Sequence, residues 1–375
     1  MEAVPSARQG VLRARRPGRH LAWIGQSLLW LIAAVAVIIL ARDFWQNPAL
    51  FIQIIISGLQ LGFVYALIAL GYTMVYGIVK LINFAHGDVF MVGSFVSFYA
   101  VTRFELHVWP AAVFPSLPPT LVVVLGSATV VLLSMVVCAM MAITIERTAY
   151  KPLRDAPRIA ALITAIGVSF FLEFFGALGF VFSPRFIPYQ RPFDVVTWFF
   201  HDGFYKVQAG QSPPDRSITF SNIFLLIIAA SVLVQLLLQF LVHHTKIGKA
   251  MRAASFDKPT ARLMGINVDG VISFTFAVGA AFAGLGGVLY AIAYSSIWTQ
   301  LGILPGLKAF VAAVLGGIGS IPGAFVGALI MGQAEALTMG YISTPMRDAV
   351  AFAILILVLL VRPTGIFGEP EKEKA

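Results

Sequence analysis

Long stretches without charged residues run along most of the chain, and they constrain its fold more than any other feature of the sequence. A transmembrane helix needs roughly 20 predominantly apolar residues to cross a bilayer. Only 11% of the 375 residues are charged, whereas a soluble domain carries about a quarter. We therefore predict one all-α domain over 1–375, a polytopic transmembrane helical bundle. The uncharged or nearly uncharged stretches are 21–41, 49–79, 89–102, 120–145, 159–184, 222–242, 271–298, 303–346 and 349–361.

Two of these stretches contain features that interrupt a straight helix. The run at 49–79 is too long for one straight helix and passes through Lys80 into the polar segment 82–88. The run at 303–346 is broken by glycines and a proline between 316 and 323. Irregular backbone at membrane depth is tolerated only where it is buried in protein or lines a cavity. We therefore predict about 8 to 10 spans with broken or re-entrant helices, and a translocation path that includes Asn83, His86, Gly87, Lys308, Gly316, Gly317, Gly319 and Ser320.

Basic residues account for a formal net charge of +9 and gather between the apolar runs. Loops rich in Lys and Arg mark the cytoplasmic side of a membrane protein. This charge therefore indicates topology and contact with anionic membrane lipid, rather than nucleic acid. We expect four cytoplasmic segments, namely the tail 1–20, the loop 146–158, the loop 243–270 and the tail from Arg362. The loops 103–119 and 183–221 are then extracytoplasmic.

The basic N-terminus followed by the apolar run 21–41 has the order of a signal peptide. However, Arg42 and Asp43 follow the run without a small-residue cleavage pattern. We therefore expect a retained first transmembrane helix.

The loop 243–270 contains the signals of a short helix. Asp257 or Lys258 can cap its start, Pro259 suits its first turn, and Gly265 suits a left-handed stop. A two-turn helix over 258–264 between two spans is either a docking element or a membrane-surface connector.

Ionisable residues inside apolar runs are costly and usually functional or paired. Lys308 can form a buried ion pair with Glu335 or Glu173, line a path or relay protons. Lys80, His86 and Asp88 lie at a predicted helix break near an interface, where water can solvate them. Small residues also recur four apart, which predicts closely packed helices. These are Gly58 and Gly62, then Gly279, Ala283 and Gly287, and finally Gly323 and Gly327.

Catalytic motifs are missing from the sequence. It has no G-x-x-x-x-G-K-[ST] loop for ATP phosphates, no H-E-x-x-H and no G-x-S-x-G. Gly317 and Gly319 begin a dinucleotide-like pattern, but Pro322 takes the third glycine position. The single cysteine, Cys138, excludes an internal disulfide. We expect a transport protein without its own ATPase site, cofactor or metal.

Three segments resemble the LivH-type permeases of ABC importers for branched-chain, hydrophobic amino acids. They are YTMVYGIVKLINFAHGD at 72–88, the pattern at 252–269 that continues to 280–287, and GLKAFVAAVLGGIGS at 306–320. The resemblance covers roughly 50–365. The first segment is fairly specific to the branched-chain amino acid branch, and the other two are shared with sugar and urea or amide permeases.

This resemblance implies partners and a location. It implies a second permease chain, two cytoplasmic ATPase subunits and an extracytoplasmic solute-binding protein, in a bacterial or archaeal plasma (inner) membrane. It also makes 245–266 the region that seats in an ATPase groove. The residues expected to carry this coupling are Arg252, Asp257, Lys258, Ala261, Arg262 and Gly265.

The expected mechanism is alternating access driven by ATP closure of the ATPase dimer. We expect an apolar path for Leu, Ile and Val side chains, with free backbone groups at Asn83 and at 316–320 for the charged ends of the amino acid. Two alternatives remain open. One is a permease for urea, amides or another small solute in the same family, and the other is an ion-coupled secondary transporter.

Overall fold

The computed structural model describes residues 41–154, 156–201, 203–207, 213–214, 217–362 and 364–368. The chain divides into two compact units, Met1–Ile52 and Gln53–Ala375. The expected cytoplasmic tail 1–20, all but the last residue of the expected first span 21–41, and the end of the C-terminal tail lie outside the described residues.

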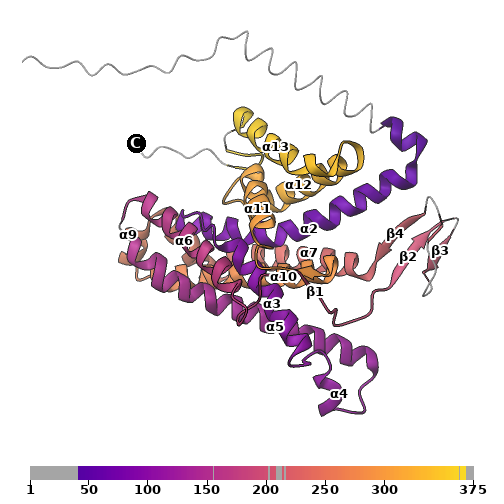
Figure 1. Cartoon of the computed structure of the whole chain (residues 1–375). Coiled ribbons are helices and arrows are strands. Elements are labelled where there is room, and N and C mark those ends of the chain that lie inside the picture. The colour runs from indigo at the N-terminus through magenta and orange to yellow at the C-terminus, as the bar shows by residue number, and fades with distance from the viewer. Residues whose placement is uncertain are drawn as a thin grey trace, which may run out of the picture. The chain divides into compact units, whose positions relative to one another are not determined.

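Helices make up most of the described chain (Figure 1). They are α2 (Pro48–Val79), α3 (His86–Thr102), α4 (Trp109–Val113), α5 (Pro119–Ile145), α6 (Arg158–Gly176), α7 (Asn222–His244), α8 (Lys246–Phe256), α9 (Lys258–Leu263), α10 (Val268–Tyr294), α11 (Ile303–Gly316), α12 (Ile321–Tyr341) and α13 (Arg347–Val361). A π-helical turn (Glu146–Tyr150) and a 3-10 turn (Lys151–Leu153) extend α5, and another 3-10 turn (Thr344–Met346) precedes α13.

Seven helices in the described residues are long and apolar enough to cross a membrane. The chain is therefore an all-α, multi-pass membrane protein, as predicted. Two further helices are short: α3 has 17 residues and α11 has 14. At about 1.5 Å per residue, α11 reaches only about 21 Å, less than the roughly 30 Å hydrocarbon core. The predicted breaks are confirmed, since residues 80–85 separate α2 from α3 and residues 317–320 separate α11 from α12.

The run at 49–79 forms a single helix, since α2 is continuous over 32 residues. Its second half is buried on nearly every side, from Leu61 to Val75. Such a helix is held by its protein neighbours, so bilayer thickness does not set its length. The expected span 159–184 also ends early. α6 stops at Gly176, and the ring of Phe182 folds back to stack on Phe95 at 4.3 Å between centroids.

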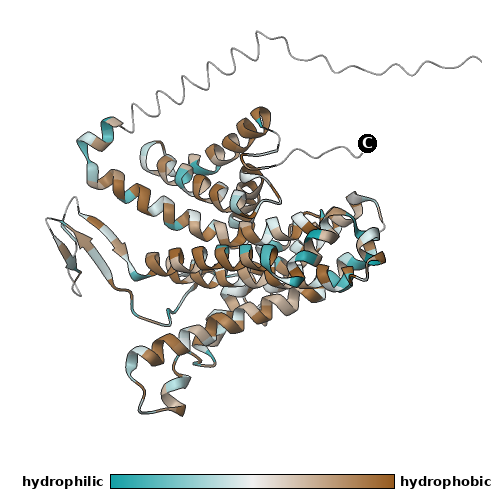
Figure 2. Cartoon of the chain, turned by 180° about the vertical axis from the view of Figure 1, so that it is seen from behind, coloured by the Kyte–Doolittle hydropathy of each residue, from teal (hydrophilic) through white to brown (hydrophobic). Residues whose placement is uncertain are grey.

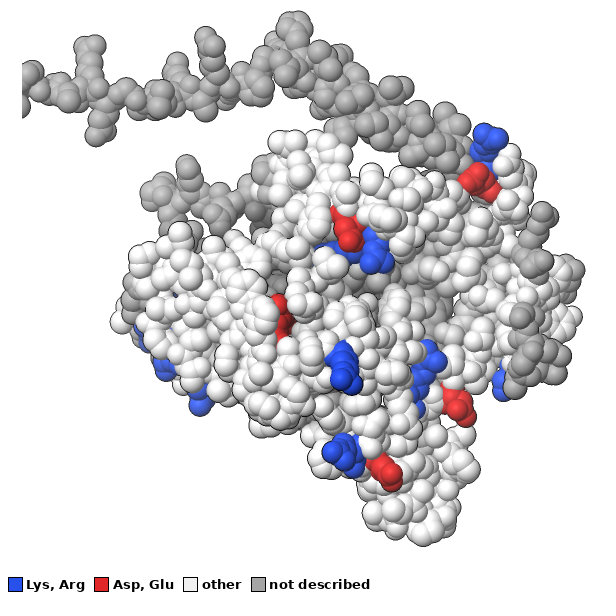
Figure 3. Space-filling model, in the orientation of Figure 1, with Lys and Arg blue, Asp and Glu red and all other residues white. Residues whose placement is uncertain are grey.

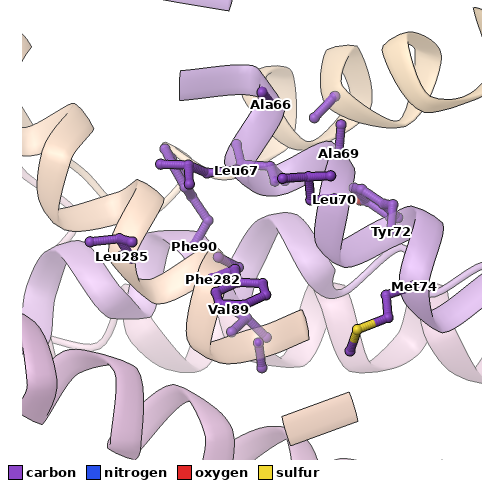
Figure 4. Close-up of a cluster of buried hydrophobic side chains, with 14 of the residues drawn as sticks. Ala66, Leu67, Ala69, Leu70, Tyr72, Met74, Val89, Phe90, Phe282 and Leu285 are labelled. Atoms are coloured by element: carbon purple, nitrogen blue, oxygen red, sulfur yellow. The ribbon is translucent and has the colours of Figure 1, made fainter. Parts of the chain in front are cut away.

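α2, α3 and α10 form the centre of the bundle. Figure 4 shows side chains of all three converging, among them Leu67 of α2, Phe90 of α3 and Phe282 of α10. Small residues permit this packing. A Cβ added at Gly284 of α10 would lie within 3.1 Å of Ser134 and Cys138 of α5. The small-residue stripes of the sequence thus mark close helix contacts within one chain.

Other helices present apolar side chains outward. In the most apolar 18-residue segment of α5, α6 and α7, only 22% is buried inside the protein, and in that of α13 only 6%. Figure 2 shows these helices largely in the hydrophobic colour, and most of the face drawn in Figure 3 carries no charged side chain. An exterior of this kind suits lipid or another membrane chain and not water.

The second unit has two different ends. α9 and the start of α6 lie at one end, here called the α9 end, and the small sheet β3-β2-β4 lies at the other (Figure 1). The loop 183–221, expected to be extracytoplasmic, contributes β1 (Ile187–Pro188), β2 (Thr197–Phe200), β3 (Phe204–Lys206) and β4 (Ile218–Ser221). β1 pairs with β5 (Ser296–Ile297). At the α9 end, Arg154 and Asp269 connect the loops 146–158 and 243–270.

Candidate translocation and coupling sites

α9 forms as its sequence signals predict. The Asp257 side chain accepts a hydrogen bond from the Thr260 amide at 3.2 Å, Pro259 lies in the first turn, and Gly265 adopts φ +81° after the helix. Ala261 is buried and faces the bundle, whereas Leu263 and Met264 are 87% and 78% exposed. The helix therefore has one anchored face and one apolar face that is open to a partner.

The expected coupling residues do not all face outward. Lys258 is half-buried, and its Nζ donates to the Val79 carbonyl at the end of α2, 3.1 Å away. Burial and the nearby positive charges of Arg154 and Arg262 lower the pKa of Lys258. Arg252 is exposed and donates to the Val242 carbonyl, which holds α8 against the end of α7. α9 thus contacts the bundle where α2 ends.

A network of charges fixes the loops of the α9 end to each other. Glu146 is fully buried and accepts from Arg154 and from the Ser273 hydroxyl, the latter at 2.6 Å. Asp269, in the first turn of α10, pairs with Arg154 at 2.6 Å, Lys151 at 3.0 Å and Arg262 at 3.2 Å. The carboxylates therefore join α5, α9 and α10 into one support for the coupling loop.

The break between α2 and α3 folds back into the bundle. Lys80, the residue directly after α2, adopts a left-handed conformation with φ 61°, which reverses the direction of the chain. Asn83 is 5% exposed, and its Oδ1 accepts from the Tyr150 hydroxyl at 2.6 Å. Gly87 packs against Gly302 and Gly306, and no room is left for a Cβ. The start of α3 therefore touches the start of α11.

Water does not solvate His86 and Asp88, so this expectation is wrong for both residues. Each is 2% exposed, because the chain after Lys80 enters the bundle instead of following its surface. The His86 ring meets Tyr72 edge-on at 4.7 Å, and its Nε2 has no hydrogen-bond partner among the described residues. Asp88 accepts from the Ser169 hydroxyl of α6 at 2.5 Å and is hydrogen-bonded to Glu173. Lys80 alone is exposed.

The turn between α11 and α12 is covered by the chain itself. The amides of Ile366 and Phe367 donate to the carbonyls of Leu315 and Gly316 at 3.0 and 2.9 Å. The expectation of free backbone groups at 316–320 is therefore wrong for the Gly316 carbonyl, because a segment 51 residues later caps it. Gly317 and Gly319 have φ +108° and +96°, and the Ser320 hydroxyl accepts from the Gly323 amide at 3.2 Å.

Lys308 lies in a buried ionic cluster. Its Nζ is 2.8 Å from Glu335 and 2.6 Å from Asp348, and the Tyr65 hydroxyl donates to the same Glu335 oxygen at 3.3 Å. The predicted pair with Glu335 is confirmed, whereas Glu173 belongs to the Asp88 group instead. The cluster joins α2, α11, α12 and α13.

Sequence reasoning missed Glu146, Tyr150, Asp269 and Asp348. Each stands beside the end of an apolar run, where a polar residue ordinarily meets water. Each has at least one partner far away in sequence, for example Arg154, 115 residues from Asp269. The sequence signals such residues only by placing charged side chains at the ends of the predicted spans. That position does not identify the partner of each charge.

Comparison with known proteins identifies the family. The family model described as "Branched-chain amino acid transport system / permease component" matches residues 54–359. The high-affinity branched-chain amino acid transport system permease protein LivH of Escherichia coli strain K12 is 42% identical over 324 residues, which cover 86% of this chain and 97% of that protein. The corresponding protein BraD of Pseudomonas aeruginosa is 40% identical over 324 residues, 86% of this chain and 98% of its own length.

A more distant similarity is limited to part of the chain. The ribose import permease protein RbsC of Escherichia coli strain K12 is 30% identical over 129 residues, 32% of this chain and 40% of that protein. No solved structure matches this chain. Because the family model and the LivH and BraD similarities extend over almost the whole described bundle, the chain belongs to the LivH-type family of branched-chain amino acid transport permeases.

Proposed function

We propose that this chain is the membrane-spanning permease subunit of an ATP-binding-cassette importer for branched-chain amino acids. The observation that carries the proposal is the 40–42% identity to LivH and BraD over 86% of the chain, together with the family match over 54–359, which includes both breaks and the loop 243–270. A second permease chain completes the path, and two ATPase subunits supply the energy. The assembly lies in a bacterial or archaeal plasma membrane.

The surface of α9 supports coupling to a separate ATPase. The sequence has no phosphate-binding loop of its own, so energy must enter through a contact with another chain. Leu263 and Met264 form an exposed apolar tip on a helix whose other face is anchored by Ala261. Such a tip fits a hydrophobic groove in a partner. The α9 end is accordingly the cytoplasmic end.

The opposite end suits a solute-binding protein. The sheet β3-β2-β4 exposes aromatic side chains, with Phe204 70% and Tyr205 54% exposed. Aromatic residues are enriched in protein interfaces because they bury large areas at a small loss of conformational entropy. We place this sheet outside the membrane, where a loaded binding protein docks.

The α2–α3 break is the proposed substrate-contacting part of the path. It brings the amide of Asn83 and the ring of His86 into the interior of the bundle, where most buried side chains are apolar. Apolar walls suit Leu, Ile and Val side chains, and polar groups at a helix break suit the charged ends of an amino acid.

The decisive experiment is purification of the tagged full chain from its native membrane, followed by uptake in proteoliposomes. We expect a second permease and two ATPases to co-purify, and ATP-dependent uptake of radiolabelled leucine when the binding protein is added. Uptake of urea or an amide in place of leucine would assign another substrate within the family. Uptake by the chain alone, driven by an ion gradient, would overturn the importer proposal.

A matched pair of variants tests the coupling contact. Leu263→Asp places a charge on the exposed tip of α9 and should abolish co-purification of the ATPases without unfolding the chain. Phe200→Asp places the same charge on an exposed aromatic residue of β2 at the other end. ATPase co-purification should survive Phe200→Asp. Equal retention in both variants would argue against α9 as the docking helix.

A further inference from the structure

A cavity of about 730 Å³ lies at the α9 end, beside the hydrogen bond from Lys258 to Val79 and the ion pair of Glu146 with Arg154. It lies between the end of α2, the end of α5, the start of α6, α9 and α10. One wall is made by Val79, Leu81 and Ile82, and the facing wall by Ile159 and Leu162 of α6. A cavity of several hundred cubic ångströms with mainly apolar walls has the size of a small-ligand site.

Positive charge gathers in this cavity. Lys80, Arg154 and Lys258 line it, and Glu146 is the only carboxylate in its described lining. Glu146 is already bound by Arg154 and by the Ser273 hydroxyl. Lys80 and Lys258 have no carboxylate within ion-pair distance among the described residues. The cavity therefore carries uncompensated positive charge, and an anion would complete it.

The cavity also opens toward the apolar exterior of the bundle. Ile159 lines the cavity and is 65% exposed, and Ile163, one turn further along α6, is 63% exposed. Only 22% of the most apolar 18-residue segment of α6 is buried inside the protein. The apolar wall of the cavity is therefore continuous with a helix face that suits hydrocarbon. An occupant with an anionic head and apolar chains matches both parts.

A transported amino acid matches the cavity less well. A zwitterion needs an acceptor for its ammonium group as well as donors for its carboxylate. Glu146 is buried and its oxygens are bound by Arg154 and Ser273, so no free carboxylate faces the cavity from the described residues. A zwitterion has no net charge and would add an ammonium group to a cavity that already holds uncompensated cations. A head group with net negative charge and no cation is favoured instead.

We propose that this cavity binds an anionic phospholipid, with the phosphate held between Lys80 and Lys258 and the acyl chains along Ile159 and Leu162. Basic pockets between membrane helices on the cytoplasmic side have the right chemistry for anionic head groups. The phosphate would connect the residue that ends α2 to the first residue of α9. The lipid would thus stabilise the support of the coupling helix, separately from the path for substrate.

The test is native mass spectrometry of the delipidated full-length chain in detergent. Phosphatidylglycerol and phosphatidylcholine with identical acyl chains are added at equal concentrations. We expect a preference for phosphatidylglycerol in the wild type. Because each lysine near an anionic lipid contributes about fivefold in affinity, Lys80→Gln/Lys258→Gln should bind phosphatidylglycerol roughly 25-fold more weakly.

Two further variants make the result specific. Lys246→Gln/Lys249→Gln removes two exposed lysines of α8 that do not line the cavity, and it should retain the preference. Leu162→Trp fills the cavity without changing charge and should also lose the preference. This variant keeps the test open if the double lysine variant does not fold. Equal binding of the two lipids, or an equal loss in the α8 control, would overturn the proposal. Displacement of the lipid by glycerol 3-phosphate at comparable concentration would show a site for a free anion and would also overturn it.

Discussion

The Nζ of Lys258 donates a hydrogen bond to the main-chain carbonyl of Val79 over 3.1 Å. This contact joins the first residue of α9 to the last residue of α2, at the point where the chain turns back into the bundle. A force on α9 therefore reaches the break that contains Asn83 through a direct contact. The first prediction tests this connection.

Lys258→Met should leave ATPase subunits bound, because Leu263 and Met264 are unchanged, but should lower ATP-driven uptake about tenfold. A hydrogen bond from a charged donor contributes about 1.5–3 kcal/mol, which corresponds to a factor of ten or more. Lys249→Met is the control, since this lysine is exposed on α8. Uptake rates in proteoliposomes provide the measurement, and wild-type uptake in Lys258→Met would contradict the prediction.

Lys308→Met should destabilise the protein by about 3–5 kcal/mol, because it leaves the buried carboxylate of Glu335 without its cation, whereas Asp348 keeps Arg347 at 3.3 Å. Glu335 is 1% exposed, so water cannot replace the lost partner. Lys308→Met/Glu335→Leu should recover part of the loss. Thermal unfolding in detergent checks both variants. If the double variant were no more stable than the single one, the cluster would not act as an ion pair.

Gly87→Ala should be strongly destabilising, because the added methyl group meets the Gly302 backbone and lies 3.1 Å from the Gly306 Cα. Overpacking of this kind typically costs about 1–3 kcal/mol. Gly167→Ala in α6 is the matched control, since nothing lies within 4 Å of its added methyl group. That variant should gain up to about 1 kcal/mol of helix propensity. Unfolding temperatures that change equally in both would contradict the close contact of α3 and α11.

Ile366→Pro should destabilise the turn between α11 and α12. Proline has no amide hydrogen, so the 3.0 Å bond to the Leu315 carbonyl is lost, at a cost of about 1–3 kcal/mol. Phe367→Ala keeps its amide and changes an exposed side chain, so it should be close to neutral. Proteolysis of the C-terminal segment provides the readout. Equal protection of the Ile366→Pro variant and the wild type would show that this cap is dispensable.

Asn83→Leu should lower uptake, since it removes the acceptor of the 2.6 Å hydrogen bond from Tyr150 and the polar group of the α2–α3 break. Tyr150→Phe removes the donor but keeps the Asn83 amide. Loss of uptake in Asn83→Leu with retention in Tyr150→Phe would assign the role to the amide itself. Normal uptake in Asn83→Leu would remove Asn83 from the proposed path.

Features that depend on neighbouring residues along the chain were predictable from sequence. The membrane class follows from long apolar runs, because the bilayer imposes one requirement on each segment separately. α9 follows from Asp257, Pro259 and Gly265, because capping involves atoms within a few residues of each other. The break at 316–320 was predicted for the same reason, since its glycines are adjacent in sequence.

Features that depend on distant residues were not predictable. Burial of His86 and Asp88 depends on the turn at Lys80 and on α6, which supplies Ser169 and Glu173. The cap on Leu315 and Gly316 comes from residues that read as the start of a polar tail. The cationic cavity needs Lys80, Arg154 and Lys258 to meet from three separate segments.

The sequence alone thus determined that this chain spans a membrane, where its helices break, and where the short helix α9 begins and ends. The tertiary structure alone decided which polar groups are satisfied, which cations lack a counter-charge, and that Val79 receives the Lys258 amine. The physical reason is range. Hydrophobic run length and helix capping act within a segment, whereas buried hydrogen bonds and ion pairs depend on which segments the packed bundle brings within about 3 Å of each other.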